Sequence, residues 1–199
     1  MSSERPKRAA SHSRRRACVQ FKSQDASIPA VLLEGHYHVG KAVTLHEAFK
    51  EYVESMHGSF ERLTRMEPVT IAAVPKDAPS ECIYLFSEGS RPLYVGRTRH
   101  LRQRLRQHSI PGAQHNQAVF AFRLAREKTG QLTAAYSTEG SRVALCSDSE
   151  FRAAFLEAKR RIREMHVRYV EERDPLRQAL LEIYVAVVLK TPYNDFNTH

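Results

Sequence analysis

The sequence predicts a small mixed α/β fold in which helices flank a three-stranded antiparallel sheet. Two observations support this fold class. Residues 82–86 and 93–95 are short apolar runs separated by a cluster of turn-forming residues, a pattern typical of a β-hairpin with a loop of intermediate length. Residues 165–170 alternate apolar and polar side chains, which indicates a half-buried third strand.

The N-terminal part of the chain is predicted to lie outside this core. Residues 1–17 form a polar, basic and flexible tail that contains Arg14, Arg15 and Arg16. These arginines could attract the phosphate groups of a nucleic acid without reading its sequence. Residues 18–79 are expected to form an N-terminal extension made of strand and an amphipathic helix.

The helix of this extension has clear local signals. Thr44 and Glu47 form a capping box, apolar residues follow at helical spacing, and Gly58 is expected to end the helix. We expect its apolar face to pack on the core rather than to bind a partner. The apolar run 69–74 that follows predicts a further short strand.

The segment after the hairpin carries the most specific spacing in the sequence. Gly96 is expected to end the second strand, and Thr98 to cap a helix that begins near His100. Within that helix, Arg104 and His108 share the face that carries the leucines, so they would be held near the two hairpin tyrosines. A charge-rich helix can also be an ordinary solvent-exposed face with both side chains at its rim.

The C-terminal half is predicted to be mainly helical. Residues 117–124 fit a strand or a helix, residues 128–147 are expected to be irregular, and Asp148 can cap a helix. Asp174 and Pro175 open the last helix. That helix is expected to bury one apolar stripe, formed by Leu176, Leu180, Ile183, Tyr184 and Val187.

The composition is that of a basic globular protein. The net charge of +9 favours a polyanionic partner, with nucleic acid as the first candidate and an acidic membrane surface as the weaker one. The three cysteines, Cys18, Cys82 and Cys146, are far apart and odd in number, which favours a reducing compartment and a cytoplasmic protein. The sequence shows no secretory signal, and the apolar run 183–189 is too short to span a bilayer, so we expect no membrane partner.

The hairpin and the helix after it resemble the GIY-YIG nuclease family, which is named after two strand motifs. The first motif stands here as Cys-Ile-Tyr at residues 82–84, and the second as Tyr-Val-Gly at residues 94–96. Arg104 and His108 follow the second motif at the family's spacing without a gap. The stretch is also similar to the nuclease domain of the bacterial excision-repair incision subunit. The departure is Cys82 in place of the first glycine, a position outside the chemistry.

The resemblance implies a divalent-metal-dependent endonuclease that hydrolyses phosphodiester bonds of DNA. Residues 80–199 would form the nuclease domain, with an insertion around residues 125–163. Glu182 looks like the family's metal-binding carboxylate and would hold one Mg²⁺ or Mn²⁺, with the substrate phosphate completing the coordination. One active site cuts one strand, so a homodimer is possible.

The resemblance also implies roles within the active site. Tyr84 is the candidate general base, although a phenol at neutral pH needs nearby cations to favour its phenolate. Arg104 would bind the scissile phosphate through charge-assisted hydrogen bonds, and Tyr94 would add a second hydroxyl group. His108 would contact the phosphate or assist proton transfer, and Asn194 would orient the site.

Other interpretations remain open at this point. Arg97 and Arg99 are further candidates for substrate binding. Arg97 could also favour the phenolate, and a surface arginine that only faces a phosphate is the competing interpretation for it. A catalytically inactive GIY-YIG-like module that only binds nucleic acid is the alternative function. A basic RNA- or ribosome-associated protein is a third class, for which the sequence offers no RNP-type motif or KH loop.

Overall fold

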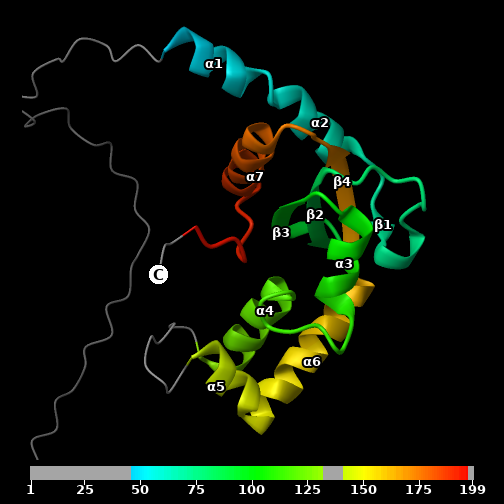
Figure 1. Cartoon of the computed structure of the whole chain (residues 1–199), viewed down its shortest axis with the longest axis vertical. Helices are drawn as coiled ribbons and strands as arrows, with labels where there is room; N and C mark the ends of the chain where they lie inside the picture. The colour runs from blue at the N-terminus through cyan, green and yellow to red at the C-terminus, as the bar shows by residue number, and fades with distance from the viewer. Residues whose placement is uncertain (1–45, 132–140, 197–199) are drawn as a thin grey trace, which may run out of the picture. The chain divides into compact units, whose positions relative to one another are not determined.

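The computed structural model describes residues 46–131 and 141–196, which form a mixed α/β fold (Figure 1). A four-stranded antiparallel sheet has the strand order β1-β4-β2-β3 and is flanked by helices. The strands are β1 (Val69–Thr70), β2 (Cys82–Glu88), β3 (Arg91–Thr98) and β4 (His166–Glu171). The helices are α1 (Glu47–Glu54), α2 (His57–Arg65), the 3-10 helix η1 (Ile71–Ala73), α3 (Leu101–Ser109), α4 (Val119–Thr129), α5 (Arg142–Ser147), α6 (Ser149–Glu164) and α7 (Pro175–Leu189).

The prediction of three strands is wrong by one. The three expected strands are present as β2, β3 and β4, and β4 pairs with β2 so that Tyr169 lies opposite Tyr84. The fourth strand, β1, is the first part of the apolar run 69–74, and its Val69 pairs with Val167 of β4. The chain then turns into η1, so this edge strand stays very short, as edge strands often do.

The hairpin is longer and tighter than predicted. Its turn is formed by Gly89 and Ser90, and Gly89 has φ +55°, a conformation that glycine adopts without steric cost. The intermediate loop expected over residues 87–92 is therefore wrong, because the outer residues of that range pair within the strands. Gly96 does not end the second strand but lies inside β3, opposite Tyr84.

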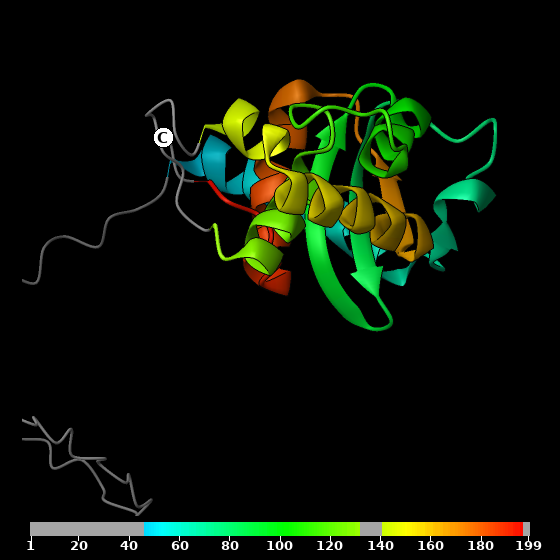
Figure 2. The same ribbon diagram turned by 90° about the horizontal axis from the view of Figure 1, so that it is seen from below.

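The sheet separates two apolar cores. Successive side chains of a strand point to opposite faces, so Tyr84 and Phe86 join the core under α3, α4, α5 and α6, whereas Ile83 and Leu85 join the core under α2 and α7. Figure 2 shows α6 crossing one face of the hairpin, and Figure 1 shows α2 and α7 on the other side of the sheet. The central strand β2 is thus buried on both faces, which explains its continuous apolar run.

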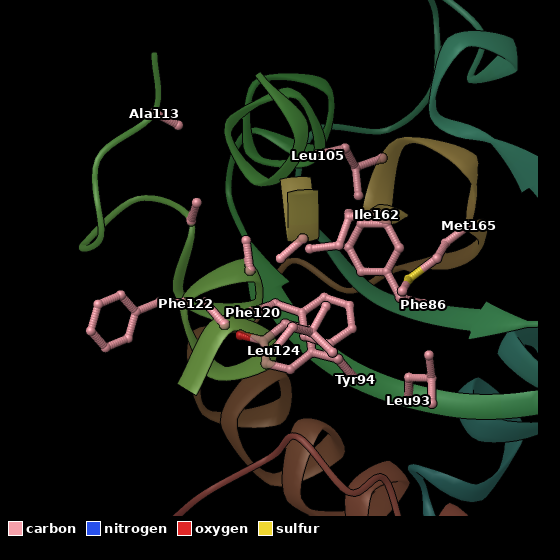
Figure 3. Close-up of a cluster of buried hydrophobic side chains, with 14 of the residues drawn as sticks. Phe86, Leu93, Tyr94, Leu105, Ala113, Phe120, Phe122, Leu124, Ile162 and Met165 are labelled. Carbon is pink, nitrogen blue, oxygen red and sulfur yellow. The ribbon is translucent and has the colours of Figure 1, made fainter. Parts of the chain in front are cut away.

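The core on the α6 side is rich in aromatic rings (Figure 3). Tyr94 stacks on Phe120 of α4 with a centroid distance of 4.8 Å and an interplanar angle of 9°. Phe86 packs against the same ring at 5.7 Å, and Leu105 and Ile162 belong to the same cluster. The direction of the Tyr94 side chain is therefore fixed by packing from β2, β3 and α4.

Residues 46–65 form two helices where one was predicted. α1 ends at Glu54, and α2 begins at His57 and contains Gly58, so the prediction that Gly58 ends a helix is wrong. Thr44 of the predicted capping box lies outside the described residues, as do the basic tail 1–17 and the segment 18–41.

The apolar face predicted for the first helix contributes little to the core. α1 has no buried residue, and among the described members of that face only Met56, beyond the end of α1, is buried. α2 supplies Leu63, which is fully buried in the core shared with α7. The described residues all belong to one compact unit, and the boundary at residue 79 stays a prediction.

Several helix predictions can be compared directly with the structure. Residues 117–124 mostly belong to α4, so the helix alternative holds, whereas the irregular conformation expected for residues 128–147 is wrong where α5 forms. Asp148 and Asp174 cap α6 and α7, as predicted, by accepting hydrogen bonds from the backbone N–H groups of Phe151 and Arg177. None of the helices in the described ranges is long and apolar enough to cross a membrane.

α7 turns a different face to the core than predicted. Leu181 and Val185 are fully buried, whereas the expected core residues Leu176, Ile183 and Val187 are 60%, 45% and 66% exposed. The reason is that α7 carries apolar residues on all sides. The apolar pattern of α7 therefore did not define which face is buried. Packing against β2 and β3 determines that Leu181 and Val185 face the core.

Candidate active site

Three of the predicted site residues are in direct contact. The hydroxyl oxygen of Tyr84 lies 2.9 Å from Nε2 of His108, and Nε of Arg104 donates to the same oxygen at 3.3 Å. The spacing of four residues on α3 turns Arg104 and His108 toward the hairpin, as the sequence predicts. His108 is fully buried, so this face of α3 is not a plain solvent-exposed face.

The environment of Tyr84 keeps its hydroxyl group protonated. The side chain is fully buried, and this burial, followed by the nearby Tyr94, raises the pKa of Tyr84 well above its ordinary value. The guanidinium group of Arg104 acts in the opposite direction but does not outweigh burial. In the state described, Tyr84 is thus a neutral phenol shielded from water.

His108 is a neutral imidazole. Burial, and second the charge of Arg104, lower the pKa of His108 to about 3. Nε2 faces the Tyr84 hydroxyl, whereas Nδ1 is buried and has no hydrogen-bond partner within the described part of the chain. A neutral Nε2 without a hydrogen can therefore accept a hydrogen bond from the Tyr84 hydroxyl group, and an anion beside Arg104 would oppose one of the two causes that keep the imidazole neutral.

Arg104 is held from both sides. Besides its bond to Tyr84, its Nη1 donates to the backbone carbonyl of Gln117 at 2.8 Å. Gln117 belongs to the connection between α3 and α4, and Lys159 of α6 fastens the same connection by donating to the carbonyl oxygens of Pro111 and Ala113 at 2.8 and 2.5 Å. The guanidinium group is therefore positioned by a loop that is itself attached to α6.

Glu182 reaches this group of residues from α7. Its carboxylate lies 3.2 Å from Nε of Arg97 on β3, and its side chain is 19% exposed. Burial raises the pKa of Glu182 above its ordinary value, and three guanidinium groups oppose this shift, in decreasing order those of Arg97, Arg104 and Arg123. Glu182 is thus one carboxylate in the field of three cations, and an anion is attracted to its surroundings.

Tyr94 completes the cluster from β3. Burial raises the pKa of Tyr94, the charge of Arg104 lowers it and that of Glu182 raises it. Glu182 also contributes to the raised pKa of Tyr84, so both tyrosines lie within electrostatic reach of the carboxylate. Tyr84, Tyr94, Arg104, His108 and Glu182 therefore gather around one end of the hairpin and α3.

Asn194 acts on the outer edge of β3. Its Oδ1 accepts from the backbone N–H of Val95 at 2.9 Å, and its Nδ2 donates to the carbonyl of Val95 at 2.8 Å. Thr191 donates a further bond of 2.8 Å to the same Oδ1. The side chain thus takes the place of a neighbouring strand and fixes the edge between Tyr94 and Gly96.

Arg97 and Arg99 share a pocket next to the cluster. The pocket has a volume of about 280 Å³ and is lined by Arg97, Thr98, Arg99, Pro175 and Gln178. Arg97 is half exposed, and its ion pair with Glu182 links the pocket to the carboxylate. Both predicted substrate-binding arginines on β3 and after it are therefore near the site, whereas Arg14, Arg15 and Arg16 lie outside the described residues.

A divalent metal ion fits this site only if a bound phosphate group supplies part of its coordination. No group of three or more His, Cys, Asp or Glu side chains that could hold a metal occurs in residues 46–131 and 141–196. Glu182 is a hard oxygen donor of the kind that Mg²⁺ and Mn²⁺ prefer, but it stands alone among arginines. A phosphate group would add the missing oxygen ligands and offset the positive charge.

Sequence reasoning missed Arg123, and it named Gly96 without predicting its contact with Tyr84. Arg123 of α4 donates to the backbone carbonyl of Tyr193 and to that of Asp195, and its charge acts on Glu182; no motif in the sequence marks it. Gly96 lies against the Tyr84 hydroxyl. Cys82, which replaces the first glycine of the motif, is buried, and burial raises the pKa of its thiol to about 12, so it is inert.

Comparison with known proteins adds no assignment, because no family model, no curated protein and no solved structure matches the chain.

Proposed function

We propose that this protein is a divalent-metal-dependent endonuclease of the GIY-YIG type that hydrolyses phosphodiester bonds of DNA, with one active site per chain. The observation that carries the proposal is the gathering of Tyr84, Arg104 and His108 in direct contact, with Tyr94 and Glu182 within electrostatic reach. Glu182 is 74 or more residues from the others in sequence, so nothing local brings it there. The net charge of +9 supports a polyanionic substrate.

Arg104 and Arg97 are the proposed ligands of the scissile phosphate. Arg104 is held by Tyr84 and Gln117, so its guanidinium group is already oriented before a substrate arrives. Such a preorganised cation stabilises charge that grows on the phosphate in the transition state. Glu182 would hold one Mg²⁺ or Mn²⁺ together with a phosphate oxygen. When bound, that ion would polarise the phosphate and lower the pKa of a coordinated water molecule.

Tyr84 is the proposed general base, and His108 is proposed to take the proton that Tyr84 gives up. The buried hydroxyl group must first gain access to the attacking water, which requires the long bond from Arg104 Nε to break while the bond from Nη1 to Gln117 keeps the guanidinium group in position. The phosphate charge would also oppose the effect of Arg104 on the pKa of His108. The proton of the water would then pass to Tyr84 as the Tyr84 proton passes to His108 Nε2, 2.9 Å away.

The test is cleavage of labelled duplex, single-stranded and branched DNA with Mg²⁺ or with EDTA. Arg104→Ala is expected to lower the rate on the order of 10²-fold or more, because it removes a transition-state contact. Glu182→Ala and Tyr84→Phe should abolish or cripple cleavage but leave gel-shift affinity intact. Arg152→Ala on the exposed surface of α6 is the matched control for loss of one positive charge, and it should cut normally.

A second candidate function is a DNA-binding module without activity. The specific observations in its favour are the ion pair that occupies Glu182 and the full burial of the Tyr84 hydroxyl group. This alternative wins if the wild-type protein shifts DNA in a gel but cuts none of the three substrates with Mg²⁺ or Mn²⁺. A Glu182→Ala variant that cuts at the wild-type rate would instead refute the metal assignment.

A further inference from the structure

The positive charge of the chain is concentrated in two segments. Residues 97–126, which run from the end of β3 through α3 into α4, contain seven arginines and no Lys, Asp or Glu, a charge of +7. Residues 1–17 contain six basic residues and one acidic residue, a charge of +5. Because the whole chain carries +9, all other residues together carry −3. Outside the tail, the charge that attracts a polyanion therefore belongs to α3 and its neighbours.

Two of these arginines lie on the outer side of α3. The apolar residues and the histidine that face the protein interior are Leu101, Leu105 and His108. Arg102 and Arg106 are exposed and one helical turn apart. With 3.6 residues per turn, they lie on the flank opposite to Arg104, so they take no part in the contact with Tyr84. The outer flank of α3 is thus a second group of cations beside the proposed active site.

The fold itself does not explain these two charges. In residues 46–131 and 141–196, the side chains of Arg102 and Arg106 make no ion pair, hydrogen bond or ring contact. Like charges four residues apart repel each other in a helix. Arg102 also lies in the first turn of α3, which has no acidic residue, and a cation there opposes the helix dipole. Both effects destabilise the free helix, and a bound anion would reverse both.

We propose that Arg99, Arg102 and Arg106 form a surface that binds backbone phosphates of a nucleic acid outside the scissile phosphate. Arg102 and Arg106 are about 6 Å apart along the helix axis, and the phosphates of one strand repeat about every 3.4 Å along a duplex, so both can reach one strand. The exposed Arg99 continues the surface toward Arg97, with which it shares a pocket.

The surface lies within reach of a substrate bound at Arg104. A helix with its side chains is about 10 Å thick, which corresponds to roughly three base pairs along a duplex. A nucleic acid that places one phosphate at Arg104 can therefore continue across α3 to the outer arginines. The proposal rests on the proposed function for the class of its partner, a nucleic acid, but it requires no cleavage.

An acidic membrane fits this surface less well than a nucleic acid. A helix that binds at a membrane interface inserts apolar side chains into the lipid beside its basic residues. The apolar side chains of α3 are instead buried in the core of the protein, and its exposed residues are Arg102, Gln103 and Arg106. Guanidinium and amide groups hydrogen-bond to phosphate and sugar oxygens, which are the groups that a nucleic-acid backbone presents.

The experiment measures binding of a labelled DNA duplex to the full chain in EDTA over a series of salt concentrations. The double variant Arg102→Gln/Arg106→Gln removes two charges and retains good helix formers. It should reduce the slope of log K against log salt by about 2 and weaken binding at least about tenfold at about 0.1 M salt. Arg65→Gln/Arg152→Gln is the matched control, because it removes two exposed arginines outside residues 97–126, and it should keep the wild-type slope.

Two further readouts exclude a merely structural effect. The thermal unfolding midpoint of the α3 double variant should be no lower than that of the wild type, because a like-charge pair is removed. In the cleavage assay with Mg²⁺ the variant should raise KM and keep kcat at saturating DNA, because these contacts are equal in the bound substrate and the transition state. Arg104→Ala should instead lower kcat.

The outcomes separate this surface from the nuclease. An unchanged salt slope in the α3 double variant overturns the proposal even if the protein cuts DNA, and so does an equal loss of slope in the control. A reduced slope in a protein that cuts no DNA supports the surface and refutes the nuclease. Vesicles that contain phosphatidylserine test the membrane: a variant that loses vesicle binding but keeps its DNA affinity overturns the proposal.

Discussion

The hydroxyl group of Tyr84 occupies the space in which any residue other than glycine at position 96 would place its Cβ. A Cβ built on Gly96 would lie 2.4 Å from Oη and 2.5 Å from Cζ of Tyr84. The two residues are opposite each other in the β2–β3 ladder, so the tyrosine ring lies across the strand onto the bare backbone. From there the hydroxyl group meets both His108 and Arg104.

Gly96→Ala is expected to displace the Tyr84 ring. The added methyl group would overlap the Tyr84 side chain, which cannot move aside because it is fully buried. We therefore expect a loss of about 1–3 kcal/mol in the free energy of unfolding. Urea unfolding measures this change. Gly58→Ala in α2 is the control, since a Cβ there meets only the end of Arg62 at 3.6 Å and should be neutral or stabilising. Equal stabilities of the two variants would contradict the close contact.

Arg97→Ala is expected to strengthen the binding of Mn²⁺ in the absence of nucleic acid. The ion pair at 3.2 Å competes for the Glu182 carboxylate, so its removal should raise the affinity severalfold, as measured by titration calorimetry. Arg99→Ala removes the same charge near the same pocket without breaking that pair, and it should have a smaller effect. Mn²⁺ binding that is unchanged in Glu182→Gln would show that the ion binds elsewhere.

The stability of the protein should fall in mild acid because of His108. Its folded pKa is about 3 and its ordinary value is about 6.5, so between these values the unfolded chain binds one more proton than the folded chain. The contribution of the neutral imidazole is complete above pH 6.5 and is lost as the pH falls toward 3, by about 1.4 kcal/mol per pH unit within the window. Urea unfolding of wild type and His108→Gln from pH 7 to 4.5 should show a shallower slope for the variant. His100→Gln on the exposed surface should keep the wild-type slope.

Asn194→Asp should loosen the edge of β3. The substitution removes the Nδ2 donor and sets a carboxylate oxygen against the Val95 carbonyl, which is expected to cost about 1–3 kcal/mol. Hydrogen exchange of the Val95 amide, which now donates to Oδ1, reports the local effect. Asn116→Asp introduces the same charge at an exposed position and should leave this amide protected. If Val95 exchanges at one rate in both variants, Asn194 does not fasten the strand.

Elements with strong local chemistry were predictable from the sequence. Asp148 and Asp174 begin helices because each carries an acceptor for the free N–H groups of the first turn. The face of α7 was not predictable, because a helix with apolar residues on every side offers no period to detect. Gly58 failed as a helix end for a related reason: glycine only weakens a helix, and packing of Leu63 on the second core favours its continuation.

Within the site, the fixed spacing of Arg104 and His108 on one helix predicted that both face the hairpin. Two other relationships have no counterpart in local sequence. The ion pair of Arg97 with Glu182 depends on how α7 lies along β3, and the bond of Arg104 to the Gln117 carbonyl depends on the path of a loop. Such contacts arise from tertiary packing, which spacing along the chain does not contain.

The attachment of the α3–α4 connection to α6 has a mechanical consequence. Lys159 holds this connection at Pro111 and Ala113, and Gln117 farther along it holds Arg104. The connection therefore links α6 to Arg104 through hydrogen bonds at three of its residues. A loop attached in this way is unsuited to open and close as a lid. A shortened chain without α5 and α6 would keep every residue of the two motifs. It would nevertheless lose Lys159, which holds the connection that positions Arg104.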